Sequence, residues 1–309
     1  MLEIKEYVKA ETLAQAYELN QKKTNQIIGG MLWMKLGDHR IQTAIDLSGL
    51  GLDTIEETPE EFSIGCMVSL RQLELHEGLE QWTQGAVRES VCHIVGVQFR
   101  NLATVGGSLY GRYGFSDVLT CFLVLDAYVE LYKGGIIPLE QFVQMPKDND
   151  ILVRVIVKKT PGRYAYLSHR NTKTDFPVLT CAVSADEKGV RAAIGARPGK
   201  AMLVPIPGIG SCFGKEEAAG EAGVCCGQDE AVGEADVCCG KNEAAGEADA
   251  GPVETAESRE ERLCVIAERI AEQIPMGSNM RASAQYRTHL VKVLLKRGFQ
   301  QLLDNRENT

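Results

Sequence analysis

Two glycine pairs are the residues whose position most clearly implies chemistry. Gly29-Gly30 and Gly106-Gly107 each follow a short apolar run, in the stretches IIGGMLWM and TVGGS. Glycine weakens a strand or helix by about 0.5–1 kcal/mol, so each pair implies a sharp turn or a close approach to the backbone. Because glycine lacks a Cβ atom, such a loop can bring several N–H groups onto a bulky anion. Two loops of this kind facing each other would suit a pyrophosphate group.

The spacing of these glycines matches neither of the two common nucleotide-binding motifs. It is not the G-x-G-x-x-G of a dinucleotide fold, nor the G-x-x-x-x-G-K-[ST] of a P-loop. On spacing alone, the alternative that each pair only makes a turn stays open. No Ser-His-Asp, HExxH or paired-carboxylate arrangement stands out, so we predict no catalytic and no metal-ligating residue. His93 is alone among apolar residues, which favours a structural role.

Composition restricts the function classes. The chain has 309 residues, which favours two or three domains, and its 44% hydrophobic and 24% charged residues are typical of a globular protein. No run approaches about 18 apolar residues, and the N-terminal stretch has no apolar signal core, so we expect a cytoplasmic protein without membrane contact. That location argues against disulfides among the ten cysteines. No basic stripe with interleaved aromatic residues predicts nucleic-acid binding.

Residues 212–258 form a low-complexity segment with a 13-residue repeat. The units EAAGEAGVCCGQD and EAVGEADVCCGKN begin at Glu217 and Glu230. Twelve acidic residues against two lysines between 215 and 258 account for the net charge of −9, so the rest of the chain is nearly neutral. Paired zinc or iron–sulfur ligands are usually two to four residues apart, whereas these cysteines are adjacent. We predict a linker, with metal or redox chemistry of the paired thiols as the alternative.

The elements that must position the glycine pairs indicate an α+β fold. We expect a helix near 11–23, strands ending at 30 and near 50, a strand and a helix within 62–75, and a helix that starts at Ser116. Strands near 127–132 and 151–159 follow, then a hairpin around Lys188-Gly189 and a final amphipathic helix after Ser283. The first half is therefore α/β in character, and antiparallel strands and helices follow it.

The order of these motifs closely resembles the FAD-binding subunit of the molybdenum hydroxylases, the family of the carbon monoxide dehydrogenase medium subunit and the xanthine dehydrogenase FAD domain. The most specific piece is RNLATVGGS followed by SD. VRAAIGARP and RASAQYRTHLVKVLLKR resemble the C-terminal flavoprotein domain of that family. The resemblance implies a two-part PCMH-type FAD-binding domain at 1–160, a C-terminal domain at 161–211 and 259–309, and an insert at 212–258.

The resemblance also implies FAD, with its pyrophosphate held by the two glycine loops. The family usually has Thr or Ser and Asp after the first glycine pair, where this chain has Met31-Leu32, and Asn after the second, where it has Ser108. A lysine found near the flavin in some members aligns with Ala165 or Tyr166. The implied FAD-binding residues are Ile27, Ile28, Gly29, Gly30, Met31, Leu32, Trp33, Met34, Thr104, Gly106, Gly107, Ser108, Ser116, Asp117 and Leu152.

Each of these residues also has a plain alternative. Asp117 could serve only as a first-turn helix charge, Trp33 could be a core residue, and Tyr110 and Tyr113 could lie on the surface or cover the flavin. Cys66, Cys92, Cys121 and Cys181 have the sequence context of buried small hydrophobic residues.

The function that follows is an oxidoreductase subunit that transfers electrons. In the family, a molybdopterin subunit hydroxylates the substrate, and a subunit with [2Fe-2S] clusters passes the electrons to FAD and on to NAD or another acceptor. This chain lacks the plant-type C-x₄-C-x₂-C spacing, so its iron–sulfur partner is expected to be another polypeptide. The alternatives are a scaffold subunit that has lost FAD and a free-standing flavin reductase.

Overall fold

The computed structural model describes residues 1–209, 213 and 256–307. The repeats predicted to form a linker lie outside the described residues. The fold is α+β, as predicted, with one parallel sheet and two antiparallel sheets. Among the described residues, no helix combines the length and apolar character needed to cross a membrane.

The N-terminal sheet is parallel and has the order β1-β3-β2 (Glu3–Lys9, Arg40–Asp46 and Gln26–Ile28). Helix α1 (Leu13–Asn20) begins after Thr12, whose side chain accepts a hydrogen bond from the Gln15 N–H, and it leads from β1 towards β2. A small hydrophobic cluster forms here around Ile28, Ile41 and Ala44. The short β2 ends one residue before the first glycine pair, so this sheet fixes where that loop starts.

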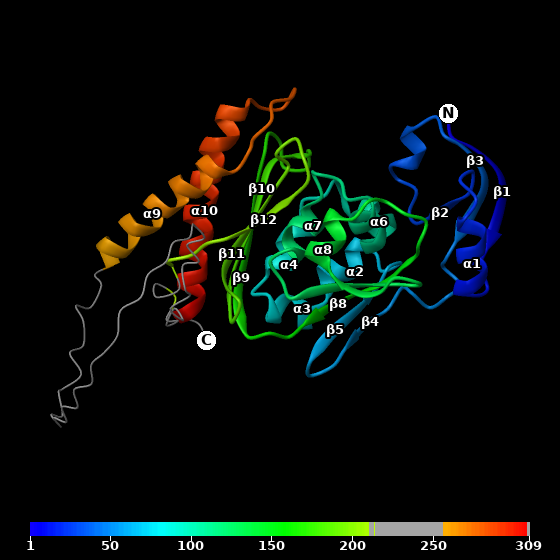
Figure 1. Cartoon of the computed structure of the whole chain (residues 1–309), viewed down its shortest axis with the longest axis horizontal. Coiled ribbons are helices and arrows are strands. Elements are labelled where there is room, and N and C mark those ends of the chain that lie inside the picture. Colours follow the sequence, from blue (N-terminus) through cyan, green and yellow to red (C-terminus); the bar gives the residue numbers. More distant parts are fainter. Residues whose placement is uncertain (210–212, 214–255, 308–309) are drawn as a thin grey trace, which may run out of the picture.

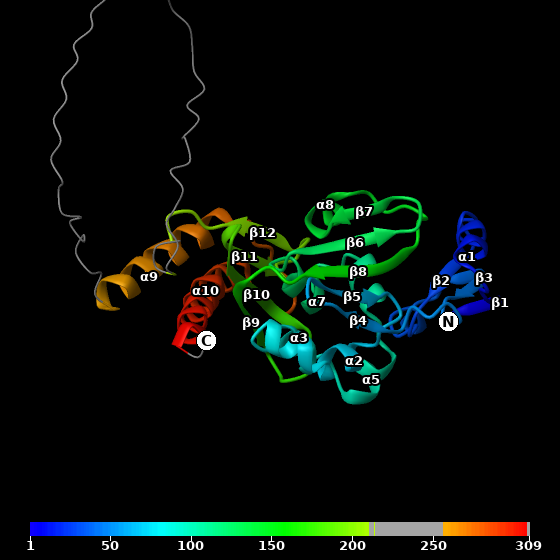
Figure 2. The same cartoon turned by 90° about the horizontal axis from the view of Figure 1, so that it is seen from below.

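A five-stranded antiparallel sheet follows, in the order β4-β5-β8-β6-β7 (Ile55–Glu57, Glu61–Gly65, Leu152–Lys158, Ala127–Leu131 and Gly135–Pro138). Figure 2 shows this sheet between the N-terminal and the C-terminal sheets. Most of the short helices occur between β5 and β6. These helices, together with α8 after β7, are α2 (Leu70–Leu75), α3 (Glu77–Trp82), α4 (Ala86–Cys92), α5 (Val97–Leu102), α6 (Val105–Tyr110), α7 (Asp117–Phe122) and α8 (Leu139–Gln144).

The C-terminal sheet is antiparallel, with the order β12-β11-β10-β9 (Met202–Pro205, Gly189–Gly195, Pro177–Asp186 and Gly162–Arg170). The predicted hairpin at Lys188-Gly189 joins β10 and β11. Every residue of β10 is buried, because alternate side chains enter different cores: Ala182 joins the core of the first half, and Val183 joins the core beneath the last helices. Figure 1 shows α4 and α7 on one side of this sheet and the last two helices on the other.

The last two helices, α9 (Ala256–Gln273) and α10 (Ala284–Glu307), pack on each other, and α10 lies on β9 and β10. Ser283 caps α10, as predicted, by accepting a hydrogen bond from the Tyr286 N–H. Arg287 of α10 is fully buried and donates to the carbonyl oxygens of Val178, Gly277 and Ala282. These bonds tie the start of α10 to β10, so the C-terminal sheet and its helices form one layered unit.

Candidate functional site

The loop after β2 presents a run of unpaired backbone donors. Within the described part of the chain, the N–H groups of residues 29–34 donate no hydrogen bond to another protein group. Met31 has a φ angle of +55°, and successive N–H groups around such a left-handed residue form a concave site for anions. Residues 29–34 are half-buried or exposed, so these N–H groups are open to solvent and to a ligand. This loop is therefore built for water or a ligand that accepts several hydrogen bonds.

The two glycine segments lie against each other, as the sequence led us to expect. A Cβ atom on Gly29 would come within 2.8 Å of the Thr104 Oγ1 atom. One on Gly30 would come within 1.9 Å of the Leu102 carbonyl oxygen, which is closer than any real contact. Gly30 is thus required by the close approach of the first loop to the backbone of the second segment. The contact places the unpaired donors of 29–34 beside the start of α6.

The second segment corrects one prediction. The stretch TVGGS is not a strand followed by a loop but the beginning of helix α6, with Thr104 as its N-cap. The Thr104 hydroxyl accepts a hydrogen bond from the Gly107 N–H at 3.1 Å, and the N–H groups of Val105 and Gly106 donate to Val68 and Cys66. Because these amides already have protein partners, the first loop offers more free donors than the second.

Gly106 and Gly107 serve different purposes. A Cβ on Gly106 would lie 2.7 Å from the Cys66 carbonyl oxygen and 2.9 Å from its Cβ, so this glycine allows α6 to pack against the end of β5. A Cβ on Gly107 would meet only the Thr104 Oγ1, at 3.1 Å. Gly107 lines a cavity, whereas Gly106 does not. Contact of Gly107 with the ligand stays a prediction that the cavity favours, whereas for Gly106 the structure shows a packing role instead of a place in the cavity wall.

The next polar group of the site is at the N-terminus of α7. Ser116 caps this helix, as predicted, by accepting a hydrogen bond from the Leu119 N–H, and its hydroxyl donates to the Ser108 carbonyl. Asp117 follows it and is buried. Its Oδ1 atom accepts a 2.5 Å hydrogen bond from the Tyr166 hydroxyl and pairs with the Arg170 guanidinium.

The Asp117 carboxyl group titrates abnormally. Burial raises its pKa to about 6, and the Arg170 charge and the Tyr166 hydroxyl, which favour the ionised form, offset only part of this effect. The Arg170 side chain is only 6% exposed and also donates to the Asp175 carbonyl oxygen at 2.6 Å. The alternative that Asp117 is only a first-turn helix charge is insufficient, because its side chain holds two groups of β9 in place.

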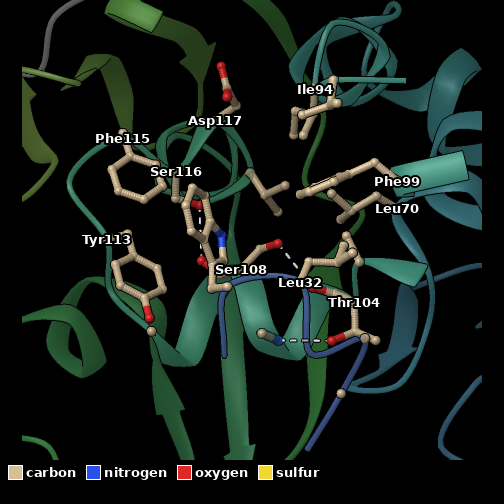
Figure 3. A pocket seen from close by; sticks show the side chains of 18 of the residues that line it. Leu32, Leu70, Ile94, Phe99, Thr104, Ser108, Tyr113, Phe115, Ser116 and Asp117 are labelled. Atoms are coloured by element: carbon tan, nitrogen blue, oxygen red, sulfur yellow. Dashed lines mark hydrogen bonds between the residues drawn. The ribbon is translucent and has the colours of Figure 1, made fainter. Parts of the chain in front are cut away.

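Aromatic side chains form one wall of the site. The ring of Trp33 lies 5.4 Å from Phe115, 5.3 Å from Phe176 and 6.4 Å from Tyr113. Tyr113 and Phe115 stack at 5.3 Å. Trp33 is 41% exposed, so it is not a core residue. Figure 3 shows Tyr113 and Phe115 across the site from Leu70, Ile94 and Phe99.

These elements enclose a cavity of about 480 Å³. Most of the residues that the sequence singled out line it: Ile27, Gly29, Gly30, Met31, Leu32, Trp33, Met34, Thr104, Gly107, Ser108, Ser116 and Asp117. Three do not. Ile28 belongs to the small N-terminal core, Gly106 faces Cys66, and Leu152 is buried in the main core as the first residue of β8.

Several lining residues were missed at the sequence level. Arg170, Phe115, Phe176, Ile94 and Phe99 all contribute to the cavity. A signal was available for Phe115, which is adjacent to Ser116, but Arg170 and Phe176 come from β9 and the segment that follows it. Nothing in the sequence alone brings that strand to α7.

The tyrosines and cysteines are placed as follows. Tyr113 lines the cavity, and Tyr110 contacts it while its hydroxyl donates to the Asp148 carbonyl oxygen at 2.7 Å. Cys66, Cys121 and Cys181 are buried, as predicted, and burial raises the pKa of each thiol to about 12. Cys92 is only half-buried, which corrects the prediction for that residue.

Comparison with known proteins identifies the family. Residues 2–159 match the family described as "FAD binding domain in molybdopterin dehydrogenase". The chain belongs to this family. Its cofactor is FAD, and it is an oxidoreductase subunit of the molybdenum hydroxylase type. The curated protein YgfM of Escherichia coli K12, which is described as uncharacterized, is 26% identical over 204 residues, spanning 64% of this chain and 77% of YgfM.

Solved structures of low sequence identity share the fold. A carbon monoxide dehydrogenase of Hydrogenophaga pseudoflava aligns with a TM-score of 0.71 at 16% identity, covering 97% of both chains. Quinoline 2-oxidoreductase of Pseudomonas putida 86 aligns with a TM-score of 0.70 at 16% identity, again over 97% of each. The reconstituted CO dehydrogenase of Oligotropha carboxidovorans gives a TM-score of 0.70 at 18% identity, over 96% of each.

The residues present fit FAD. The unpaired N–H groups of 29–34 can donate hydrogen bonds to a pyrophosphate, and no side-chain hydroxyl or carboxylate is needed for that. Met31, which stands where the resemblance places Thr or Ser, packs together with Met34 on the small core of Ile28, Ile41 and Ala44 instead. The cavity volume lies within the range of about 300–1,000 Å³ that ligand sites occupy. The aromatic wall suits a planar ring.

Proposed function

We propose that this chain is the electron-transfer flavoprotein subunit of a multi-subunit molybdenum hydroxylase. It takes electrons from [2Fe-2S] clusters on one partner, which a molybdopterin partner has reduced, and passes them to NAD or another acceptor. The proposal is supported by the family and by the fold shared with carbon monoxide dehydrogenases and quinoline 2-oxidoreductase. One of those structures is described as lacking the Mo-pyranopterin moiety of the molybdenum cofactor, so that cofactor belongs to the enzyme it represents.

One observation carries the proposal: the run of unpaired N–H groups at 29–34 opens into the aromatic-lined cavity. Six such donors beside an aromatic-lined cavity favour a bound cofactor over a scaffold subunit that has lost FAD. The change from Thr or Ser and Asp to Met31-Leu32 removes side-chain contacts but leaves these backbone donors in place. The FAD-binding role therefore does not depend on the family side chains at that position.

Each part of the site has a distinct task towards FAD. The N–H groups of 29–34 bind the pyrophosphate, and Gly107 leaves room for it beside the first turn of α6. Asp117 accepts hydrogen bonds from hydroxyl groups of the cofactor, with Arg170 holding the carboxylate in its ionised form. Trp33, Phe115 and Phe176 form the apolar wall and exclude water.

The bound FAD supplies a group that exchanges two electrons with one partner and single electrons with another. The chain's own contribution is to hold and orient that group. Arg170 is the permanently cationic side chain among the described residues that line the cavity. Because it pairs with Asp117, its charge serves mainly to neutralise that carboxylate beside the cofactor.

Purification from the native host tests the proposal. A tagged chain is isolated under mild conditions, and FAD, iron and molybdenum are measured per chain, followed by anaerobic addition of NADH. We expect about one FAD per chain together with iron and molybdenum from co-purified partners. The absorption bands of oxidised flavin should bleach when the substrate of the complex is supplied.

Two results would overturn it. A chain that carries the metal-containing partners but binds no added FAD would be a scaffold subunit. A chain that binds FAD, carries neither iron nor molybdenum, and is reduced by NADH alone would be a free-standing flavin reductase.

A further inference from the structure

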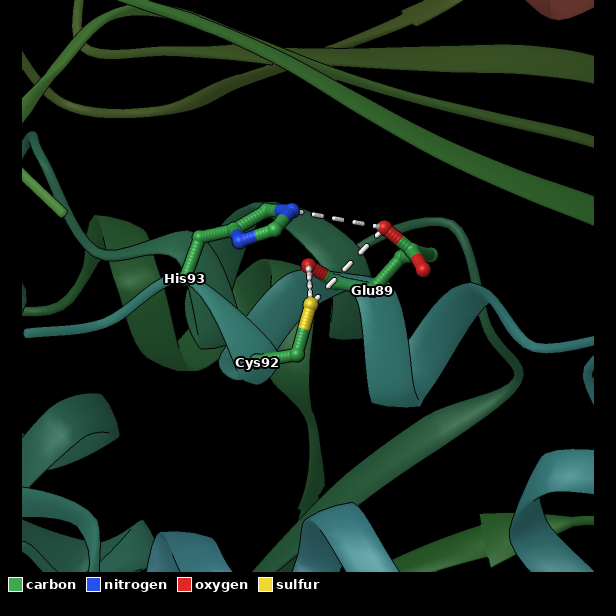
Figure 4. Close-up of side chains that lie close together, drawn as sticks. All are labelled: Glu89, Cys92 and His93. Atoms are coloured by element: carbon green, nitrogen blue, oxygen red, sulfur yellow. Dashed lines mark hydrogen bonds and ion pairs between the residues drawn. The ribbon is translucent and has the colours of Figure 1, made fainter. Parts of the chain in front are cut away.

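The C-terminal end of α4 brings three different metal-ligand side chains together. Glu89 and Cys92 lie in the last turns of this helix, and His93 is its C-cap. Their ligand atoms all lie within 4.8 Å of one another. Figure 4 shows the three side chains converging on one side of the helix end. None of them contributes to the FAD cavity.

The distances are close to those of a metal centre. The Cys92 Sγ atom is 3.8 Å from the Glu89 Oε2 atom, and the His93 Nε2 atom is 3.9 Å from the same oxygen. With ordinary Zn–S, Zn–N and Zn–O bonds, tetrahedral geometry places the sulfur and oxygen about 3.6 Å apart, and the nitrogen and oxygen about 3.4 Å apart. The third pair, Cys92 Sγ and His93 Nε2, lies within 4.8 Å, against about 3.6 Å in the same geometry, so a side-chain movement of up to about 1 Å would bring all three atoms onto one ion.

The ligand types select a class of metal. One thiolate, one imidazole and one carboxylate suit a borderline ion such as Zn²⁺ rather than Mg²⁺ or Ca²⁺, which prefer oxygen ligands. Glu89 and His93 are partly exposed, with side-chain exposures of 57% and 33%, so water can reach a fourth position. We propose that Glu89, Cys92 and His93 bind one divalent cation of the zinc class, with water as the fourth ligand.

The site is directly connected to the cavity wall. Ile94 and Val95 follow His93 in the chain, and both line the FAD cavity. Val95 has a φ angle of +51°, which is unfavourable for a β-branched residue, and the Ile94 carbonyl accepts a hydrogen bond from Arg100. A metal at the end of α4 would hold this turn in place. The inference does not rest on the proposed function, because the chain can be tested without FAD.

A redox role for Cys92 is less favourable than metal binding. Burial, with a further contribution from Glu89, raises the pKa of the thiol to about 11, and reactive thiols instead have a lowered pKa. The competing interpretation is that the cluster is only a helix end. In that case the thiol donates to the Glu89 carbonyl oxygen and His93 pairs with Glu89 across one turn.

Cobalt titration of the full-length chain decides between these interpretations. The protein is stripped of metal with a chelator and freed of FAD, and Cys212, Cys225, Cys226, Cys238 and Cys239 are replaced by serine so that they cannot bind the probe. We expect one equivalent of Co²⁺ to produce a thiolate-to-metal charge-transfer band and the visible bands of a tetrahedral site. Added Zn²⁺ should displace the cobalt and abolish these bands.

Variants assign the ligands. Cys92→Ala should abolish the charge-transfer band, and His93→Ala and Glu89→Gln should each weaken Co²⁺ binding by about tenfold or more. Cys264→Ala is the matched control, because that cysteine is also half-buried but lies on α9. Circular dichroism of every variant checks that the fold is kept. The proposal is overturned if the serine-substituted chain gives no thiolate band, or if the band persists in Cys92→Ala.

Discussion

Replacing the two neighbouring glycines of α6 by alanine, one at a time, separates folding from cofactor binding. Gly106→Ala and Gly107→Ala add the same methyl group at adjacent positions of one helix. The first points at Cys66, where the Cβ would meet a carbonyl oxygen at 2.7 Å and a side-chain carbon at 2.9 Å. The second points towards the FAD cavity, where only the Thr104 Oγ1 lies within 4 Å.

The expected effects on stability have opposite signs. Gly106→Ala overpacks the contact between α6 and the end of β5, which typically costs about 1–3 kcal/mol in the free energy of unfolding. Gly107→Ala places a better helix former at a helical position without a positive φ angle, which stabilises by up to about 0.5–1 kcal/mol. The tight contact with Thr104 offsets part of that gain. The affinity for FAD should fall in Gly107→Ala and stay unchanged in Gly106→Ala, because only the methyl group at 107 obstructs the cofactor.

The assay measures both quantities on the same preparations. Urea unfolding of the FAD-free variants gives the free energy of unfolding, and quenching of flavin fluorescence on titration gives the dissociation constant. We expect Gly107→Ala to raise that constant by at least tenfold, or about 1.4 kcal/mol, and Gly107→Val to raise it further. If Gly107→Ala is as stable as the parent and binds FAD equally tightly, the cofactor does not lie against this glycine and our reasoning fails.

Three further predictions concern the walls of the site. Burial raises the pKa of Asp117 from 3.8 to about 6, so the folded state binds this proton more tightly than the unfolded state. The contribution of Asp117 to stability should therefore fall as pH rises from 4 to 6. Thermal melts should show that Asp117→Asn removes this part of the pH dependence. Arg170→Leu leaves a buried carboxylate without its cation and should lower the free energy of unfolding by about 3–5 kcal/mol at neutral pH. Adding Asp117→Asn to this variant should recover much of the loss. Full stability of the single variant in urea unfolding would contradict the pairing. FAD should quench mainly Trp33, so Trp33→Phe should lose most of the FAD-induced change in tryptophan fluorescence while Trp82→Phe keeps it.

The local elements could be predicted from the sequence because their signals are local. Ser69, Ser116 and Ser283 precede apolar periodic runs, and in the structure each caps a helix with a hydroxyl oxygen that accepts a hydrogen bond from a backbone N–H. The hairpin at Lys188-Gly189 follows from turn chemistry alone. The prediction for TVGGS was wrong because it used local signals alone. Val and Gly beside a Thr look like the end of a strand, and only the packing of Gly106 on Cys66 makes a short helix favourable.

The site could be predicted only as far as it is contiguous in the chain. The first loop and Asp117 were found through motif order, but the partners of Asp117 were not. Tyr166 and Arg170 belong to β9, about fifty residues later, and their side chains reach α7 because alternate residues of that strand face the first core. The domain boundary near 160 stays a prediction, since Tyr164 and Tyr166 bury their side chains with the first half.

The charge of the cavity shows why the second half of the chain is needed for an anionic cofactor. Two carboxylates, Asp117 and Asp175, line the cavity, and a buried pyrophosphate would be repelled by both if they were unpaired. Arg170 of β9 pairs with Asp117, and Arg281, shortly before α10, lies 3.6 Å from Asp175. Both cations come from beyond residue 160. The first half supplies the backbone donors, and the second half neutralises the acidic groups beside them, so FAD binding should depend on both halves being folded together.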